Sequence, residues 1–405
     1  MSNAKISNIK GRAVTPAERV GNVKEYYFSR KLREVAEMNA RGLDVISLGI
    51  GGPDLPPSQE VIATLCDAAN DPRNHSYQSY TGIPELREAF ARWYARWYGV
   101  ELNPSTEILP LIGSKEGIMH ITMAFVNPGD CVLVPDPGYP TYTSVSRLAG
   151  AEIIKYSLLP ERGWMPDFDL LDTLPEVKEG RVKVMWLNYP NMPTGTPATR
   201  ELFERAVRFG REHGVLIVND NPYSFILKPS GVRPLSILEV EGAKETAMEM
   251  NSLSKSHNMA GWRVAMLAGN PEFIRWVLRV KSNIDSGQFR PVMLAAARAL
   301  DLGEEWYEEL NAVYTDRRKV AEEIMQALGC EFDPAQRGLF LWGRIPEAEE
   351  SSEAMADRIL YDKRVFVTPG FIFGRNGERY IRISLCATEE NLRRALDRIK
   401  EVKND

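Results

Sequence analysis

The sequence predicts an α/β protein, with a large domain built on a mostly parallel sheet and a smaller α+β domain. Three patterns indicate this fold. In the middle of the 405-residue chain, short apolar runs alternate with helix-patterned segments. One long amphipathic segment follows this region, and short strand-like pieces with a closing helix complete the chain.

Six apolar runs in the middle of the chain have the length of buried strands. They are Glu107–Ile112, Cys131–Val134, Val182–Leu187, Val215–Val218, Thr246–Ser252 and Arg263–Ala268. Helical stretches such as Lys115–Val126 and Thr199–His213 lie between them. Because buried parallel strands read as continuous apolar runs and are joined by crossover helices, this part is an α/β domain, which we place at residues 46–302.

The C-terminal part has a different pattern. Glu304–Leu328 is amphipathic along its whole length, and Gly329 is suited to end it as a helix. A final helix is expected after Thr388, which has a side chain suited to an N-cap. Strand-like pieces precede it at Gly338–Trp342, Val365–Thr368 and Tyr380–Leu385. We assign residues 303–405 to a small domain, with residues 1–45 beside it as an N-terminal arm that carries a helical patch around Ser29–Met38.

Composition and charge exclude several classes of partner. Hydrophobic residues make up 44% and charged residues 26% of the chain, as in soluble globular proteins. Lys plus Arg number 50 against 55 Asp plus Glu, a formal net charge of −5. We expect neither a nucleic-acid partner nor an anionic membrane, because both need a basic excess. Without a long apolar run or a signal-like N-terminus, the chain is expected to be cytoplasmic.

Cysteine and histidine are too scattered to suggest a metal site or a histidine-based nucleophile relay. We therefore expect free core thiols in a reducing compartment and no metal ion. The residues are Cys66, Cys131, Cys330 and Cys386, and His75, His120, His213 and His257.

Chemically useful side chains gather where the apolar runs end. In open α/β sheets, ligands bind at the carboxyl ends of the strands, so these residues are expected to meet at one sheet edge. They comprise a helix start suited to phosphate, an aromatic ring, a carboxylate, a phenol, a lysine and an arginine. They are Gly113, Ser114, Lys115, Tyr139, Asp220, Tyr223, Ser252, Lys255 and Arg263.

These motifs, in their order from Gly51 to Arg382, resemble the class I aminotransferases of the aspartate aminotransferase fold type. The resemblance covers nearly the whole chain. It implies that the large domain has a seven-stranded, mostly parallel sheet and binds pyridoxal 5′-phosphate. It also implies a homodimer with shared active sites. The reaction would be ping-pong: an amino acid donates its amine to the cofactor and a 2-oxo acid takes it.

The resemblance assigns the covalent and phosphate contacts of the cofactor. Lys255 matches the Schiff-base lysine, which needs a neutral amine and can shuttle a proton at the substrate α-carbon. Ser252 and Arg263, in Gly261-Trp262-Arg263, resemble phosphate ligands. The backbone N–H groups at Gly113, Ser114 and Lys115 would complete that phosphate site.

The ring of the cofactor has further expected partners. Asp220 resembles the carboxylate that keeps the pyridine nitrogen protonated, which makes the ring a better electron sink. Tyr223 resembles the phenol that donates to the ring oxygen, and Tyr139 the aromatic that stacks on the ring. Without these partners, Asp-x-x-Tyr would be an ordinary turn.

The resemblance also assigns two substrate contacts and one further contact of the cofactor phosphate. Arg382 resembles the arginine that grips the substrate α-carboxylate, and Gly51 matches a glycine near that carboxylate. Tyr77 resembles a tyrosine that reaches the phosphate of the neighbouring subunit. Arg290 is a candidate for binding an acidic substrate side chain, but a surface salt bridge is the simpler interpretation.

One position departs from the family pattern. An asparagine usually stands directly before Pro-Thr-Gly and donates to the ring oxygen of the cofactor. Here that position is Met192, whose thioether donates no hydrogen bond, and Asn191 precedes it. Either Asn191 replaces the missing donor, or Tyr223 holds the ring oxygen with less help.

Two other functions share part of the pattern. A β-lyase or synthase on the same fold would need the same cofactor and carboxylate contacts, and its products, such as pyruvate with ammonia, would distinguish it. A regulator that binds the cofactor without turnover would need an added DNA-binding domain. The segment before Ile46 is too short and not basic enough for one. The sequence does not identify the amino donor or the acceptor.

Overall fold

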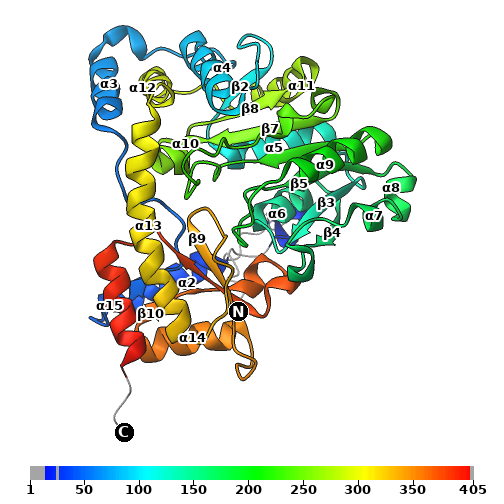
Figure 1. Ribbon diagram of the computed structural model, residues 1–405. Coiled ribbons are helices and arrows are strands. Elements are labelled where there is room, and N and C mark those ends of the chain that lie inside the picture. Colours follow the sequence, from blue (N-terminus) through cyan, green and yellow to red (C-terminus); the bar gives the residue numbers. More distant parts are fainter. Residues whose placement is uncertain (1–13, 24–26, 402–405) are drawn as a thin grey trace.

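The computed structural model describes residues 14–23 and 27–401 (Figure 1). A seven-stranded sheet with helices on both faces forms the larger part. A second assembly of helices and short strands, which contains most of the C-terminal part, lies beside it. The long helix α13 (Glu304–Ala327) runs from α12 (Arg290–Leu300) in the larger part to the second assembly. The predicted α/β class is confirmed.

The large sheet has the strand order β2-β8-β7-β6-β5-β3-β4. The ladders joining β7, β6, β5, β3 and β4 are parallel, whereas β8 is antiparallel to both of its neighbours. The beginning of β8 therefore lies at the same edge as the carboxyl ends of the parallel strands. The strands are β2 (Ile108–Leu111), β3 (Cys131–Asp136), β4 (Glu152–Ser157), β5 (Val182–Leu187), β6 (Leu216–Asp220), β7 (Ala247–Ser252) and β8 (Ala265–Gly269).

Each predicted apolar run overlaps one of these strands, but the sequence analysis missed β4. Its sequence, Glu-Ile-Ile-Lys-Tyr-Ser, lacks a continuous apolar run. Only Tyr156 of this strand is buried, because β4 lies at the edge of the sheet and pairs with β3 alone. An edge strand has less need of apolar residues than a central one.

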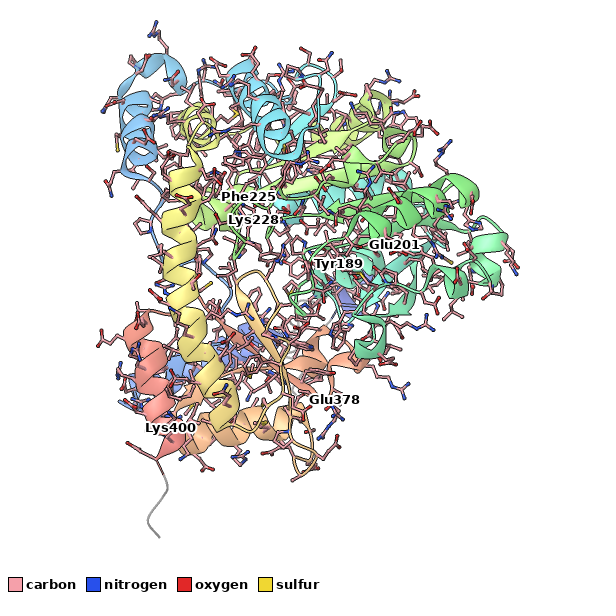
Figure 2. The ribbon with its side chains drawn as sticks, viewed as in Figure 1. Tyr189, Glu201, Phe225, Lys228, Glu378 and Lys400 are labelled. Atoms are coloured by element: carbon pink, nitrogen blue, oxygen red, sulfur yellow. The ribbon has the colours of Figure 1, made fainter. Side chains whose placement is uncertain are left out.

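Successive side chains of the central strands enter two separate cores. Met185 and Leu187 of β5 pack into one core, and Val184 and Trp186 pack into the other. This alternation follows from the two-residue repeat of a strand. The first core is covered by α4 (Pro84–Tyr98), α9 (Arg200–His213) and α12, and contains Tyr189 and Phe225, which Figure 2 labels. The second is covered by α5 (Ser114–Phe125), α6 (Pro140–Leu148) and α11 (Pro271–Lys281).

The second assembly is built on a three-stranded antiparallel sheet. Its strands are β11 (Thr368–Pro369), β12 (Tyr380–Ser384) and β9 (Phe340–Arg344). Helices α13, α14 (Ser352–Lys363) and α15 (Glu389–Lys400) pack on a common apolar core. As predicted, the Thr388 side chain caps the closing helix by accepting a hydrogen bond from the Asn391 backbone N–H at 3.2 Å.

The N-terminal helix α2 (Tyr27–Ala40) packs on this assembly, where its Val35 and Met38 lie with Leu360 and Phe366. Directly after it, β1 (Ile46–Ser47) pairs in parallel with β10 (Val365–Phe366). The first residues assigned to the large domain therefore form a strand pair with the C-terminal part. The division at residue 46 stays a prediction.

The loop after β1 is fixed by a buried ion pair. Arg317 of α13 donates from Nη1 to Asp54 Oδ1 at 2.6 Å and from Nη2 to Asp54 Oδ2 at 2.8 Å. The Arg317 side chain is only 5% exposed, so this bidentate pair anchors the Gly51–Asp54 loop. Within the described ranges, no helix has both the length and the apolar character needed to cross a membrane.

Candidate active site

A cavity of about 370 Å³ opens at the carboxyl edge of the large sheet, beside the second assembly. Residues from strand ends, from the loop after β1 and from β12 line it together. Among the predicted site residues, its lining contains Gly51, Ser114, Lys115, Tyr139, Asp220, Tyr223, Ser252, Lys255, Arg263 and Arg382. The structure thus brings together side chains that are up to 331 positions apart in the sequence (382 − 51 = 331).

Lys255 lies on α10 (Leu253–Ser256), the short helix that directly follows β7. Its Nζ donates a hydrogen bond to the Gly51 carbonyl. Burial lowers the pKa of the Lys255 amine, and the positive charges of Arg382 and Arg263 act in the same direction. A lowered pKa favours the neutral amine that attacks an aldehyde.

Asp220 ends β6 and its carboxylate is held from one side only. The Tyr142 hydroxyl donates to Oδ2 at 3.0 Å. The other oxygen, Oδ1, is buried and has no hydrogen-bond partner in the described part of the chain. Burial raises the pKa of Asp220 to about 7, while the bond from Tyr142 and the charge of Lys255 oppose this shift. An unpartnered buried carboxylate oxygen in a cavity is suited to a ligand that brings its own N–H.

Gly113, Ser114 and Arg263 form an anion site at the N-terminus of α5. Gly113 is the N-cap residue, with φ 79° and ψ 156°. A Cβ at this position would lie 2.0 Å from Arg263 Nη2, so only glycine allows the guanidinium to cover the helix start. The buried Ser114 Oγ has no hydrogen-bond partner among the described residues. A helix N-terminus with an arginine and an available hydroxyl is suited to phosphate.

Ser252 and Arg263, two of the predicted phosphate ligands, are each held in place by local contacts. Ser252 caps α10 by accepting from the Ser254 backbone N–H at 3.1 Å. Arg263 has a positive φ of 57°, and its Nη1 donates to the Ala260 carbonyl at 2.8 Å. Because β8 is antiparallel, Arg263 precedes its strand and still lies at the carboxyl edge of the neighbouring β7.

Arg382 lies on β12 of the second assembly and lines the same cavity. Its Nη2 donates to the Gly49 carbonyl at 3.0 Å, and its Nη1 lies 3.3 Å from Met192 Sδ. The guanidinium carbon is 3.8 Å from the ring centroid of Phe340. A Cβ on Gly51 would lie 2.4 Å from the same ring, which explains the glycine there. Phe340 therefore orients the arginine and leaves no room for a side chain at residue 51.

Tyr139 and Tyr223 both line the cavity with rings that pack edge to face on a neighbour. The Tyr139 ring centroid is 5.5 Å from that of Tyr142, and the Tyr223 centroid is 6.0 Å from that of Phe340. Burial raises the pKa of both phenols, so they stay protonated at neutral pH and keep a donor O–H.

The structure brings Met192 to the cavity but not Asn191. The Asn191 Nδ2 donates to the Asn188 carbonyl at 3.1 Å, and its Oδ1 accepts from the Thr194 hydroxyl at 2.8 Å. Asn191 is thus bonded within its own loop, while Met192 and Asn188 line the cavity.

Two further predicted residues lie outside the cavity lining. Tyr77 is 90% exposed, which leaves it available to another subunit. Arg290 donates from Nη2 to Glu85 Oε1 at 2.7 Å, as in the salt-bridge alternative.

Sequence reasoning missed Tyr142 and Phe340 as residues of this site. Tyr142 follows Tyr139 by three residues, which is one helical turn, so the start of α6 was a usable signal. Phe340 carries no chemical motif, and only the pairing of β9 with β12 brings it to Arg382.

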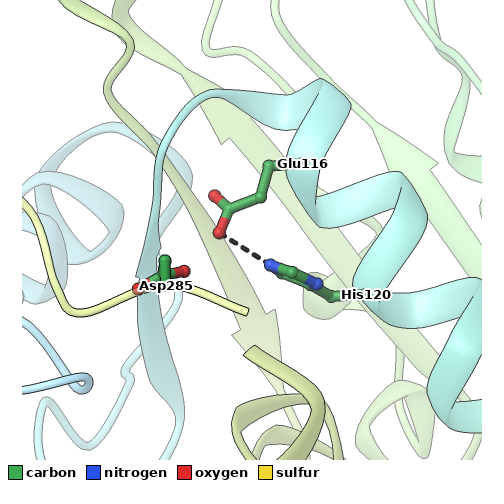
Figure 3. A group of neighbouring side chains, drawn as sticks. All are labelled: Glu116, His120 and Asp285. Atoms are coloured by element: carbon green, nitrogen blue, oxygen red, sulfur yellow. Dashed lines mark hydrogen bonds and ion pairs between the residues drawn. The ribbon is translucent and has the colours of Figure 1, made fainter. Parts of the chain in front are cut away.

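The metal-like cluster of Glu116, His120 and Asp285 lies outside this cavity (Figure 3). His120 Nε2 is 2.7 Å from Glu116 Oε1. The buried Lys281 Nζ is 3.0 Å from the same oxygen and 2.5 Å from Asp285 Oδ2. An ammonium group already fills the centre of the cluster, which makes it an ion-pair network.

The cavity residues fit pyridoxal phosphate on structural grounds. The unpartnered Asp220 Oδ1 suits a protonated ring nitrogen, and the α5 start with Ser114 and Arg263 suits the phosphate. Lys255, whose amine would bind the aldehyde, lines the same cavity.

Comparison with known proteins gives consistent matches along the chain. The family model described as aminotransferase class I and II matches residues 43–399. The LL-diaminopimelate aminotransferase of Dehalococcoides mccartyi strain 195 is 42% identical over 388 residues, covering 96% of this chain and 99% of that protein. The one from Aquifex aeolicus is also 42% identical, with 96% and 99% covered.

Solved structures agree with the sequence matches. Substrate-bound BacF from Bacillus subtilis has a TM-score of 0.90 at 35% identity, covering 96% of this chain and 98% of that one. A double mutant of Thermus thermophilus aspartate aminotransferase has a TM-score of 0.87 at 27% identity, covering 96% and 99%.

Proposed function

Because the chain belongs to the class I and II aminotransferases, which depend on pyridoxal phosphate, we propose that the cavity around Lys255 is its active site. The observation that carries this proposal is the shared cavity itself. It contains a lysine with a lowered pKa, a buried carboxylate oxygen without a partner among the described residues, and two arginines from different elements, Arg263 and Arg382.

In this proposal each end of the cavity binds one anionic group. Ser114, Ser252, Arg263 and the backbone N–H groups at Gly113–Lys115 hold the cofactor phosphate. Arg382 grips the α-carboxylate of the substrate, and the backbone at Gly51 leaves room for it.

Three side chains would orient the cofactor ring between these ends. Asp220 holds the proton on the ring nitrogen, Tyr223 donates to the ring oxygen, and Tyr139 covers one face. The bound cofactor supplies an electron sink for the bond that breaks at the substrate α-carbon.

Lys255 has two roles in this proposal. Its amine would hold the aldehyde of the cofactor covalently. When that amine is free and neutral, Nζ would take up the proton that leaves the substrate α-carbon and give it back later in the transfer. Burial and the nearby arginines favour the neutral form that both roles require.

Borohydride treatment of the loaded protein tests this assignment. The reductant should fix the cofactor irreversibly on Lys255, which peptide mapping by mass spectrometry identifies. Label on another lysine would contradict the assignment. Product analysis then separates the two reactions that this site allows: a new amino acid means transfer, whereas pyruvate with ammonia means elimination.

LL-diaminopimelate is the first amino donor to test, because relatives with that name are 40–43% identical over nearly their whole length. A panel of donors assayed with 2-oxoglutarate and pyruvate would decide. If LL-diaminopimelate reacts no faster than the other amino acids in the panel, this substrate assignment fails while the family assignment stands.

We also propose a homodimer with shared active sites. Large exposed hydrophobic residues lie close to the predicted partner-contacting tyrosine, and such groups are typical of subunit interfaces. The two segments that carry these hydrophobic residues are adjacent, because a Cβ added at Gly287 would lie 2.7 Å from the Gln78 carbonyl oxygen. The exposed hydrophobic residues are Tyr77, Tyr80, Ile284 and Phe289.

Mixed dimers test the shared site. A subunit with Tyr77→Ala keeps Lys255, and a subunit with Lys255→Ala keeps Tyr77. If Tyr77 serves the neighbouring site, their hybrid contains one intact site and should exceed both parents in activity. A hybrid with no more activity than the parents would contradict sharing.

We propose a cytoplasmic location and the two-domain division at residues 46 and 302. Cys131, Cys330 and Cys386 are buried, whereas Cys66 is exposed and is not the core thiol that we predicted. Thiols without a disulfide are typical of reducing compartments, which supports this proposal. Fractionation of the native host with antibody detection tests the location.

A further inference from the structure

The Asp220 carboxylate has two oxygens in different surroundings. Tyr142 donates to Oδ2 at 3.0 Å, whereas Oδ1 is buried without a partner among the described residues. The two oxygens of a carboxylate are chemically equivalent, so its contact with a ligand depends on its rotation about the Cβ–Cγ bond. A group that fixes this rotation also fixes where the available oxygen lies.

Tyr142 is held firmly enough to make that selection. It is 1% exposed, and its ring stacks on Trp186 with centroids 5.0 Å apart and planes 5° apart. The Ser146 hydroxyl donates to the Tyr142 carbonyl at 2.7 Å within α6. A stacked ring on a fixed helix start places its hydroxyl with little freedom.

We propose that Tyr142 is a positioning residue, which fixes the Asp220 carboxylate by its bond to Oδ2 and so keeps Oδ1 available to the ring nitrogen of the cofactor. This inference rests on the proposed function. The phenol also stabilises the ionised carboxylate, because a hydrogen bond to a charged acceptor is stronger than one to a neutral acceptor.

The surroundings of Asp220 favour its protonated form, and the hydrogen bond from Tyr142 opposes this effect. Burial raises the pKa of Asp220, and the carboxylate of Glu249 raises it further; the hydrogen bond from Tyr142 and the charge of Lys255 lower it. Without the phenol, the carboxyl group would hold its proton more strongly. The titratable groups that interact with Asp220 are Tyr142 on α6, Tyr139 directly before that helix, Glu249 on β7, Lys255 on α10, and Tyr223.

The experiment compares two probes in the cofactor-free enzyme. One is pyridoxal phosphate, and the other is its carbocyclic analogue, in which the ring nitrogen is replaced by C–H. Tyr142→Phe removes only the hydroxyl. If the phenol acts through Asp220 on the ring nitrogen, the variant should bind pyridoxal phosphate about 10-fold or more weakly, while the affinity for the analogue changes little.

Tyr156→Phe is the matched control. Its hydroxyl is likewise buried and donates to the Trp186 carbonyl at 2.6 Å, so both tyrosines contact the same tryptophan. Tyr156 does not line the cavity. Its loss should change the affinity for both probes by the same small factor.

Two further measurements test the role of Tyr142. With ¹⁵N-labelled pyridoxal phosphate, the chemical shift of the ring nitrogen should move toward the unprotonated value in Tyr142→Phe and not in Tyr156→Phe. The second measurement adds Tyr142→Phe to a protein that already carries Asp220→Asn. The ratio of the affinities for the two probes should then be the same with and without Tyr142→Phe.

Equal weakening for both probes, or weakening for neither, would overturn the role of Tyr142. So would an additional loss of discrimination in the Asp220→Asn background. If Asp220→Asn itself discriminates between the probes as wild type does, the assignment of Asp220 to the ring nitrogen is wrong, and the proposed function loses that contact.

Discussion

Replacing Gly113 with alanine tests whether Arg263 and the start of α5 form the phosphate site. A Cβ at residue 113 would lie 2.0 Å from Nη2, 2.6 Å from Cζ and 3.2 Å from Nε of Arg263. Separations below 3 Å are not tolerated, so the guanidinium must leave the helix start. The φ of 79° and ψ of 156° belong to a region that only glycine adopts readily.

The magnitude follows from these two effects. Losing the charge-assisted contact with phosphate should weaken cofactor binding by about 1.5–3 kcal/mol, which is roughly 10- to 150-fold. The backbone strain should lower the stability of the cofactor-free protein by about 1–3 kcal/mol. We therefore expect Gly113→Ala to have both a larger dissociation constant for pyridoxal phosphate and a lower unfolding temperature without cofactor.

The assay is titration of the cofactor-free protein with pyridoxal phosphate and with pyridoxal, which lacks the phosphate. The variant should lose affinity for the first probe and much less for the second. Gly129→Ala is the control, because Gly129 also has a positive φ of 89° but has no atom within 4 Å of an added Cβ. It should cost stability without changing affinity. Wild-type affinity in Gly113→Ala would refute the phosphate site.

Three further predictions concern the centre of the cavity. Lys255→Ala should still bind the cofactor through its phosphate contacts but lose transfer almost completely, which binding and turnover assays would measure; substantial turnover would contradict the assignment. Because burial raises the pKa of Asp220 to about 7 from its ordinary value of 3.8, the folded cofactor-free protein holds a proton that the unfolded chain releases. Its stability therefore falls as pH rises from about 4 to 7. Asp220→Asn should remove a penalty of up to about 4 kcal/mol above pH 7, seen as a higher unfolding temperature at pH 8 that disappears near pH 4; an equal gain at both pH values would refute the titration. Met192→Asn restores a donor beside the ring oxygen and should lower the pH midpoint of the visible absorbance change by up to about one unit. Asn191→Ala should leave that midpoint unchanged, because Asn191 is bonded within its loop, and a shift in this variant would mean that Asn191 reaches the ring oxygen.

Local sequence patterns determined the α/β class, the positions of the central strands and the family. Runs such as Val182–Leu187 have to be apolar on both faces because helices cover both, so the pattern survives in the sequence. The Ser-Leu-Ser-Lys segment and the Gly113 turn follow strand ends directly, and their position in the chain places them at the sheet edge.

The tertiary structure alone decided features that depend on distant partners. The edge strand β4 was missed because its exposed side chains carry no apolar run. Whether Asn191 or Met192 faces the cavity depended on hydrogen bonds within a folded loop. Phe340 reaches Arg382 only through the pairing of β9 with β12. The unequal oxygens of Asp220 likewise arise from α6 packing on the sheet, because no sequence pattern specifies the contact between Tyr142 and a carboxylate 78 residues away.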